Sequence, residues 1–243
     1  MSVWLCIPSK RPSGECGKLL QAWKDMGYKL MIHADSTAEA NGKSPYADQL
    51  SIGPYLGYPR TVNGLIRAVM RQDPAAQWFV TGGDDIWPDP THRAEEIALD
   101  CDEHFGGTFG VMQATGDRWG EANNDSGKGG ALIDHVAGSP FLGREFCRRL
   151  NGGQGPFWPE YFHMFDDAEL QAVATRLGVF WQRRDLIHFH DHWGRPREGE
   201  RLGRADRMPA FLKQANSAEN WNRSKSLFES RQASGWPGSE PIA

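Results

Sequence analysis

The sequence WFVTGGDDIWPDP, Trp78–Pro90, places two adjacent carboxylates directly after an apolar, strand-like run. Two glycines precede Asp84 and Asp85 and let the backbone turn sharply. In open α/β sheets, ligands bind at the carboxyl ends of the strands. Carboxylate oxygens on such a turn suit Mg²⁺ or Mn²⁺ that also holds substrate phosphates. The alternative is a solvated turn, because Asp89 and Pro90 are typical of a helix start.

Strand-like and helix-like segments alternate around this turn. Apolar runs predict strands over Val3–Ile7, Lys29–Ala34 and Trp78–Thr81. Apolar residues at helical spacing predict helices over Lys18–Met26 and Thr61–Met70. Because the first forty residues then form a strand, a helix and a second strand, a parallel crossover unit is expected. The predicted fold class is α/β, with a Rossmann-like, mixed, mostly parallel central sheet flanked by helices.

The same kinds of apolar pattern predict the helices, strands and loops in the rest of the chain. Helices are expected over Thr91–Glu103, within Ser139–Leu150, and from Asp166 or Asp167 to Gly178. Strands are expected over Phe105–Gln113, Leu132–Ala137, Val179–Trp181 and Leu186–Phe189. Segments rich in Gly, Pro and polar residues predict long loops over Ser36–Pro59, Ala114–Gly130 and Gly152–Phe165.

Composition limits the classes of protein. The chain has 243 residues and a net charge of -4, which excludes a uniformly basic nucleic-acid coat. Residues 182–231 carry eleven Lys and Arg against seven Asp and Glu, so this segment either faces an anion or is a solvated surface. The four cysteines lack Cys-x-x-Cys spacing, which indicates free thiols in a cytosol. With no signal peptide or spanning segment expected, the predicted location is cytoplasmic, without a membrane partner.

Two further clusters suggest chemistry. FDDAEL places Asp166 and Asp167 at a helix start, where negative charge is favourable even without a catalytic role. The aromatic, Gly-Pro-rich loop before them is suited to desolvate a base. HFHDHW contains His188, His190 and His192, which would share one face of a strand and so indicate a metal or phosphate site.

Two metal sites are compatible with these clusters. A three-His zinc site would use the HFHDHW segment alone and would leave the two adjacent carboxylates unexplained. A mixed site, with Asp85 and one histidine on a Mn²⁺-like ion, would explain both clusters together.

Taken in order, these motifs resemble a GT-A glycosyltransferase of the inverting, family-2-like group. VNGLIRAVM resembles the helix before the metal turn of that family, and GGDDI resembles its Asp-x-Asp motif. FDDAEL resembles the Glu-Asp-x-x-Leu motif of the catalytic base, and HFHDHW resembles the His segment that completes the metal site. The resemblance covers roughly residues 3–193.

The resemblance implies a GT-A domain over residues 1–193. Residues 194–243 would then be a helical, Arg-rich C-terminal extension of the same structural unit, serving as a lid or as peripheral helices. It also implies a divalent metal, Mn²⁺ or Mg²⁺, and a nucleotide-sugar donor, with a UDP-sugar as the first choice. With Asp85 on the last, metal-binding position of the motif, Gly83 stands where its first Asp belongs, so either the metal site has one carboxylate fewer or the register differs. Asp85 is the expected metal ligand, and Asp84 is expected near the ribose or the metal.

The resemblance and the flanking sequence predict three sets of site residues. The position of the catalytic base falls on Asp167, with Asp166 as its partner. The expected metal ligands are Asp85, His190, His188 and His192, with His190 as the central choice. The expected donor contacts are Pro8, Lys10, Arg11, Asp35, Asn63 and Asp84, with the Arg-rich segment 195–207 near the phosphates.

The acceptor is open at this point. The loops 116–130 and 152–163, rich in aromatic and polar residues, suit stacking on a sugar or a base. The overall pattern resembles phage glycosyltransferases, some of them similar to enzymes that modify hydroxymethylated pyrimidines in DNA, which would place the protein in host-cell cytoplasm. A glycan or a small molecule is the alternative acceptor.

Two other classes of protein fit the same residues. One is a metal-dependent hydrolase that uses His188, His190 and His192 with Asp84 and Asp85. The other is a non-catalytic module that binds carbohydrate or nucleic acid.

Overall fold

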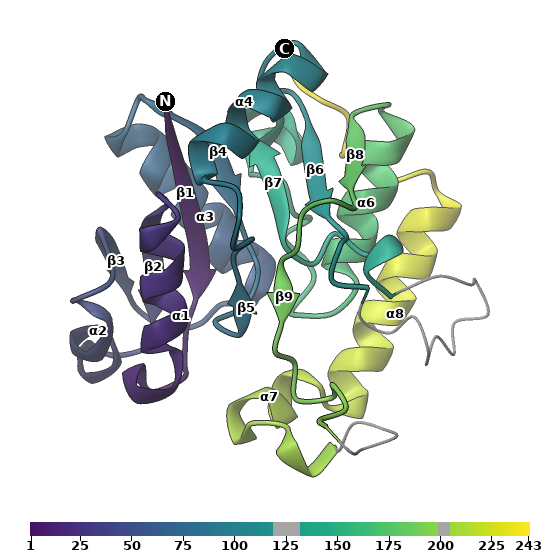
Figure 1. Cartoon of the computed structure of the whole chain (residues 1–243). Coiled ribbons are helices and arrows are strands. Elements are labelled where there is room, and N and C mark those ends of the chain that lie inside the picture. Colours follow the sequence, from purple (N-terminus) through teal and green to yellow (C-terminus); the bar gives the residue numbers. More distant parts are fainter. Residues whose placement is uncertain (119–131, 199–204) are drawn as a thin grey trace.

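The computed structural model describes residues 1–118, 132–198 and 205–243. A seven-stranded sheet lies at the centre of this part of the chain (Figure 1). Its strands run in the order β3 (Gln49–Ile52), β2 (Lys29–Ala34), β1 (Ser2–Pro8), β4 (Ala76–Val80), β7 (Pro140–Gly143), β6 (Val111–Ala114) and β8 (Phe180–Arg183). Strand β7 is antiparallel to β4 and β6, and the other neighbours are parallel. The predicted fold class is confirmed.

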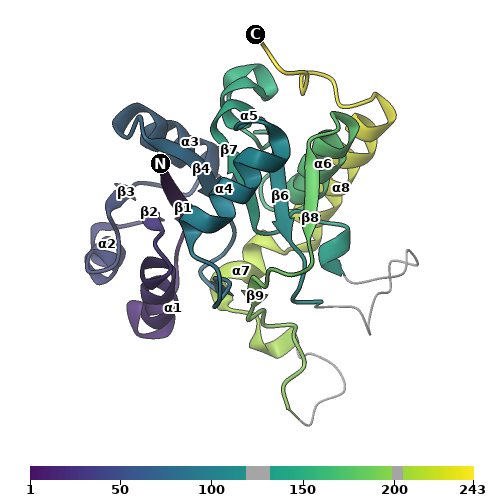
Figure 2. The same ribbon diagram turned by 45° about the horizontal axis from the view of Figure 1, so that its top comes forward.

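Helices cover both faces of the sheet (Figure 2). Helices α1 (Ser13–Asp25) and α4 (Ala94–Phe105) pack on one face. Helices α3 (Tyr58–Gln72), α5 (Arg144–Arg149) and α6 (Asp166–Arg176) pack on the other. The apolar residues of α3 recur at helical spacing, which buries one side of that helix: Val62, Leu65, Ile66 and Val69.

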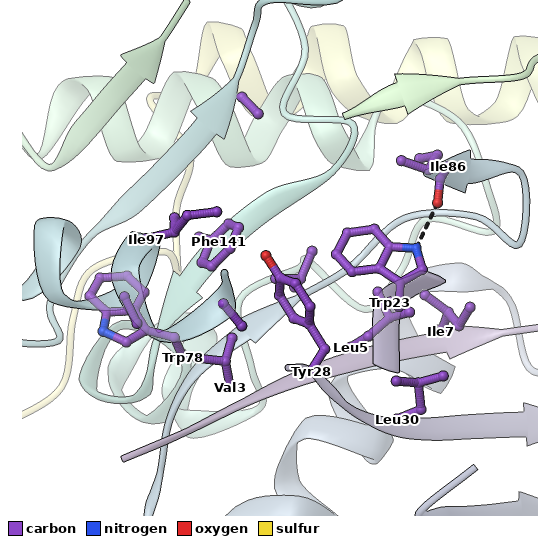
Figure 3. Close-up of a cluster of buried hydrophobic side chains, with 14 of the residues drawn as sticks. Val3, Leu5, Ile7, Trp23, Tyr28, Leu30, Trp78, Ile86, Ile97 and Phe141 are labelled. Carbon is purple, nitrogen blue, oxygen red and sulfur yellow. Dashed lines mark hydrogen bonds between the residues drawn. The ribbon is translucent and has the colours of Figure 1, made fainter. Parts of the chain in front are cut away.

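One core hydrogen bond fixes the segment that follows β4. The indole of Trp23 on α1 is buried and donates to the backbone carbonyl of Ile86 at 2.7 Å (Figure 3). Ile86 belongs to the short strand β5 (Ile86–Trp87), which pairs antiparallel with β9 (Phe189–His190). Packing of α1 therefore positions the Asp84–Asp85 turn and, through β5, the His segment.

The segment Ser36–Pro59, expected as a long loop with room for one short turn of helix, contains a seven-residue helix and a strand. Helix α2 (Thr37–Lys43) is capped by Ser36, whose hydroxyl accepts a hydrogen bond from the Glu39 amide at 3.3 Å. Strand β3 lies at the sheet edge, where its residues are half-buried or exposed. A short capped helix and an edge strand both lack the apolar periodicity on which the loop prediction rested.

Two other segments differ from expectation, and the helix that follows them in the chain agrees with it. The segment expected as a strand over Leu132–Ala137 begins with a 3₁₀ turn, and the strand is the next segment, β7. The helix expected within Ser139–Leu150, at GREFCRRL, is present as α5. All four residues of β7 are buried between two strands, so PFLG carries no alternation that could reveal it. The strand expected over Phe105–Gln113 begins at Val111, because Gly106 and Gly107 end α4 with positive φ.

The C-terminal residues carry α7 (Ala210–Ala215) and α8 (Ala218–Ala233), and further 3₁₀ turns lie at Asn151–Gly153 and Ala205–Arg207. The Arg231 guanidinium of α8 pairs with the Glu169 carboxylate of α6 at 2.6 Å, and both side chains are buried. The Tyr161 hydroxyl donates to the same carboxylate at 2.7 Å. None of the helices in the described ranges is long and apolar enough to cross a membrane.

Replacing Glu169 with Gln should destabilise the fold strongly. The substitution leaves the Arg231 charge buried without a counter-charge, which costs about 3–5 kcal/mol. Urea unfolding of Glu169→Gln measures the loss. The matched control is Glu229→Gln, which removes the exposed pair between Lys225 and Glu229 and should change stability by less than about 1 kcal/mol. Equal losses in the two variants would contradict a stabilising role for the buried pair.

Candidate functional site

The carboxyl ends of three parallel strands carry the first part of the candidate site. Ser9 follows β1, Asp35 follows β2, and the Asp84–Asp85 turn follows β4. Both chain termini lie at the opposite end of the sheet, and α7 lies on the site side (Figure 1). Parallel strands bring these residues, which are far apart in the sequence, to one edge.

Asp84 links the turn to the end of β1. Its carboxylate accepts hydrogen bonds from the Ser9 hydroxyl at 2.8 Å, from the Arg11 amide at 3.1 Å and from the Arg11 Nε at 2.8 Å. Burial raises the pKa of Asp84, although Arg11 opposes the shift. With both carboxylate oxygens engaged by Ser9 and Arg11, the main contacts of Asp84 in this structure are structural.

Asp85 faces a cation and an imidazole. Its Oδ2 pairs with Arg11 Nη2 at 2.7 Å, and its Oδ1 lies 3.4 Å from His190 Nε2. Burial raises the pKa of Asp85, but His190 and Arg11 more than offset this, so the pKa lies below its ordinary value. The carboxylate is therefore held in its charged form, which is the form that binds a metal ion.

Backbone pairing fixes the contact between Asp85 and His190. Ile86 of β5 stands opposite His190 of β9, and the Asp191 amide donates to the Asp85 carbonyl at 2.8 Å. The His192 ring lies 5.0 Å from the His190 ring. A stretch more than one hundred positions later in the sequence is thereby held against the carboxylate turn.

The Asp85 and His190 donors fit a divalent metal that shares its coordination with a substrate. The described residues contain no group of three His, Cys, Asp or Glu side chains arranged to hold a metal by themselves. Mg²⁺ and Mn²⁺ in phosphate-transfer sites are commonly bound through one or two protein side chains together with phosphates and water. Asp85 and His190 supply such a partial set.

His188 does not belong to this group. Its ring packs against Trp23 and Phe141 in the core, and its Nδ1 lies 3.1 Å from the Ser139 hydroxyl. Burial lowers the pKa of His188 to about 4. The expectation that three histidines share one strand face is wrong, because β9 is limited to two residues and His188 turns into the core.

Asp166 and Asp167 form a carboxyl pair at the amino end of α6. Asp166 is 3% exposed, and its Oδ2 has no hydrogen-bond partner among the described residues. Burial, with the Asp167 charge added, raises the pKa of Asp166 well above its ordinary value. Burial also raises the pKa of Asp167. Because two adjacent carboxylates resist double ionisation, the geometry favours a neutral Asp166 beside a charged Asp167.

Two residues that were not selected from the sequence, Tyr58 and His163, interact with the two parts of the candidate site, the carboxyl pair of α6 and the Asp84–Asp85 turn. Burial and the charge of Asp166 raise the pKa of Tyr58, whose ring packs edge-on against the ring of His163. Burial lowers the pKa of His163, and the charge of Asp85 acts in the opposite direction. His163 lies in the aromatic loop before α6, so the density of aromatic residues there was the available signal.

Of the predicted donor contacts, Asn63 is buried in the core, whereas Lys10, Asp35 and Pro8 lie at the site edge. The Asn63 side chain is buried, donates to the Phe157 carbonyl at 2.7 Å and accepts from the Phe157 amide at 3.2 Å. Both polar atoms of the Asn63 side chain thus hold the aromatic loop. Lys10 pairs with Asp35 at 2.7 Å on the site edge, beside Pro8 at the end of β1.

An arginine-lined cavity lies next to this edge. Its volume is ≈ 160 Å³, and its lining includes Arg11, Arg195, Arg197, Arg207, His192 and Trp193. Residues 199–204 of the expected Arg-rich segment, and residues 119–131, which include most of the expected loop 116–130, lie outside the described ranges. The lining also includes Asp191, and Arg11 pairs with Asp84 and Asp85 while Arg195 pairs with Asp117. The excess of arginine over acid around the hollow favours an anionic ligand.

Comparisons with known proteins give similarity in structure alone. No protein-family model and no curated sequence matches the chain. Similar solved structures include a glycosyltransferase involved in glycosylation of the major capsid of PBCV-1, with 11% identity, a TM-score of 0.33, and coverage of 59% of this chain and 61% of that one. They also include a nucleotide-diphospho-sugar transferase from Desulfovibrio desulfuricans G20, with 10% identity, a TM-score of 0.39, and coverage of 95% and 98%.

A further similar structure is a Mycobacterium tuberculosis H37Rv protein in complex with manganese. The two chains share 14% identity with a TM-score of 0.41, and the match covers 75% of this chain and 87% of that one.

The raised pKa of Asp166 predicts a pH-dependent effect of Asp166→Asn. The folded protein holds the Asp166 proton more tightly than the unfolded chain, so ionisation of Asp166 lowers stability as pH rises above about 4. Asn keeps the shape without ionising. The variant should therefore match the wild type near pH 4 and be more stable at pH 8.

Urea unfolding at several pH values measures this difference. The exposed Glu160 lies in the loop before α6, and Glu160→Gln is the control, with no comparable pH-dependent gain. An Asp166→Asn variant that is less stable than the wild type at pH 8 would show that Asp166 is ionised and paired in the folded protein.

Proposed function

We propose that this protein is a metal-dependent glycosyltransferase that moves a sugar from a nucleotide-sugar donor, a UDP-sugar first, to an acceptor hydroxyl. One observation carries the proposal. The pairing of β5 with β9 sets His190 against Asp85 at the strand edge where the arginine-lined cavity opens. A partial metal site beside a cationic hollow matches a ligand that carries a diphosphate.

The donor half of the site consists of charged residues of this chain. Asp85 and His190 would hold the divalent ion, which when bound supplies positive charge to the departing diphosphate. Arg195 and Arg197 line the cavity and would donate hydrogen bonds to phosphate oxygens. Fixed cations at the leaving group stabilise the charge that develops in the transition state.

The acceptor half depends on the carboxyl pair of α6. Asp167 would accept the proton of the acceptor hydroxyl while the oxygen attacks the anomeric carbon and the diphosphate departs. A neutral Asp166 beside it keeps a second negative charge away from the base. This arrangement corresponds to an inverting reaction, in which a single displacement joins sugar and acceptor.

The hydrolase alternative has less support from these contacts. A three-His metal centre needs His188, and that side chain is buried in the core against Trp23 and Phe141. A non-catalytic module would bind its ligand equally well after Asp85→Asn or Asp167→Asn.

Thermal unfolding with nucleotides tests the donor assignment. The panel is UDP, GDP, ADP, TDP and CMP, each with Mn²⁺ and with EDTA. A ligand at 100 times its Kd adds about 2.7 kcal/mol, which raises the midpoint by roughly 5–10 °C for a chain of this size. A shift with UDP that disappears in EDTA is expected. A shift with metal alone and none with any nucleotide would contradict the transferase and favour the hydrolase.

Two substitutions should separate donor binding from catalysis. Asp85→Asn is expected to abolish the Mn²⁺-dependent shift with UDP. Asp167→Asn should keep that shift and lower the rate of sugar transfer or of slow donor hydrolysis by roughly 10²–10⁴-fold, because a positioned base contributes that much. A binding module without catalysis predicts no turnover in the wild type and an unchanged ligand affinity in both variants.

For the acceptor, we propose a hydroxymethylated pyrimidine in DNA as the first candidate. The excess of Lys and Arg over residues 182–231 supports contact with a phosphate backbone. Transfer of labelled sugar to hydroxymethylated DNA, but not to the same DNA without the modification, is the expected result. Transfer to a glycan or small molecule with none to DNA would replace this acceptor without affecting the donor assignment.

A further inference from the structure

Arg11 occupies the centre of the carboxylate turn. Its Nε pairs with Asp84 Oδ1 at 2.8 Å, and its Nη2 pairs with Asp85 Oδ2 at 2.7 Å. The Arg11 side chain is 15% exposed, and the two carboxylates are 8% and 13% exposed. A single guanidinium therefore neutralises two adjacent, largely buried acids from the loop that follows β1.

These contacts conflict with a metal on Asp85. Arg11 holds one Asp85 oxygen, and His190 faces the other. A divalent ion bound at Asp85 would place two positive charges beside the guanidinium, and like charges repel strongly where burial lowers the dielectric constant. Metal and Arg11 Nη2 thus compete for the same carboxylate.

The surroundings give Arg11 a second place to bind. Arg11 also lines the cavity that contains Arg195, Arg197 and Arg207. The Asp84 carboxylate is held by the Ser9 hydroxyl and the Arg11 amide as well, so the turn keeps its anchors when the end of the guanidinium moves. The Nε contact to Asp84 can persist while the Nη atoms rotate, because a guanidinium carries five donors.

We propose that Arg11 is the resident counter-cation of Asp85, that a divalent metal displaces Arg11 Nη2 from this carboxylate, and that the freed guanidinium then binds a phosphate of the donor. The inference rests on the proposed function. In it, the Arg11 guanidinium moves from the Asp85 carboxylate to a phosphate of the donor. It follows that metal alone binds weakly, because it must break an ion pair. Metal and nucleoside diphosphate together bind more tightly, because the displaced Arg11 gains a new partner.

Mn²⁺ titrations followed by electron paramagnetic resonance test the exchange, with UDP as the nucleotide probe. Arg11→Met should bind Mn²⁺ alone about tenfold more tightly than the wild type, because the competing cation is gone. The factor by which UDP raises Mn²⁺ affinity should be smaller in Arg11→Met. Both quantities are measured without turnover.

Two further variants complete the test. Arg71→Met removes an exposed arginine near the end of α3 and should leave both quantities unchanged. Arg11→Lys keeps the charge but cannot bridge two carboxylates through two nitrogens, so its values should lie between those of the wild type and Arg11→Met. Arg11→Lys provides the same readouts if Arg11→Met does not fold.

The outcomes separate the inference from the function. Unchanged or weaker Mn²⁺ binding by the Arg11 variants would overturn the exchange, and so would tighter Mn²⁺ binding with an undiminished UDP effect. A wild type that binds neither Mn²⁺ nor UDP would instead contradict the proposed transferase itself.

Discussion

The site depends on the neutralisation of two adjacent carboxylates by Arg11. Asp84 and Asp85 end a buried strand, and burial raises the pKa of Asp84. Without a cation, two charged acids this close and this buried would be unfavourable. Arg11 provides the cation from the loop after β1, and the Ser9 hydroxyl adds a hydrogen bond to Asp84. The ends of β1 and β4 are thereby joined at the edge where a donor would bind.

The remaining parts of the site reach this edge through packing. The Trp23 indole on α1 fixes the Ile86 carbonyl, and pairing of β5 with β9 then sets His190 against Asp85. On the other face, the Asn63 amide of α3 holds the aromatic loop that leads into α6. Two separate core contacts therefore hold the Asp85–His190 pair and the aromatic loop before α6 in place.

Local sequence patterns predicted the parts of the fold whose burial is periodic or continuous. Strands β1, β2 and β4 and helix α3 have such patterns. Strand β7 is buried throughout but spans only four residues and shows no alternation, and the edge strand β3 has no buried residue. The site was predictable where charge is unusual, as at Asp84 and Asp85. The pairing of Arg11 with both acids, the burial of His188 and the structural role of Asn63 depend on contacts between distant segments. Residue type and spacing alone do not specify such contacts.

The central claim is that Asp85 and His190 hold a metal that the donor diphosphate also binds. Anomalous diffraction at the manganese edge, from crystals grown with Mn²⁺ and UDP, tests it most directly. The account predicts one strong peak about 2.0–2.3 Å from an Asp85 oxygen, from His190 Nε2 and from diphosphate oxygens. A peak that lies away from Asp85, or one bound by the histidines with the nucleotide elsewhere, would contradict it.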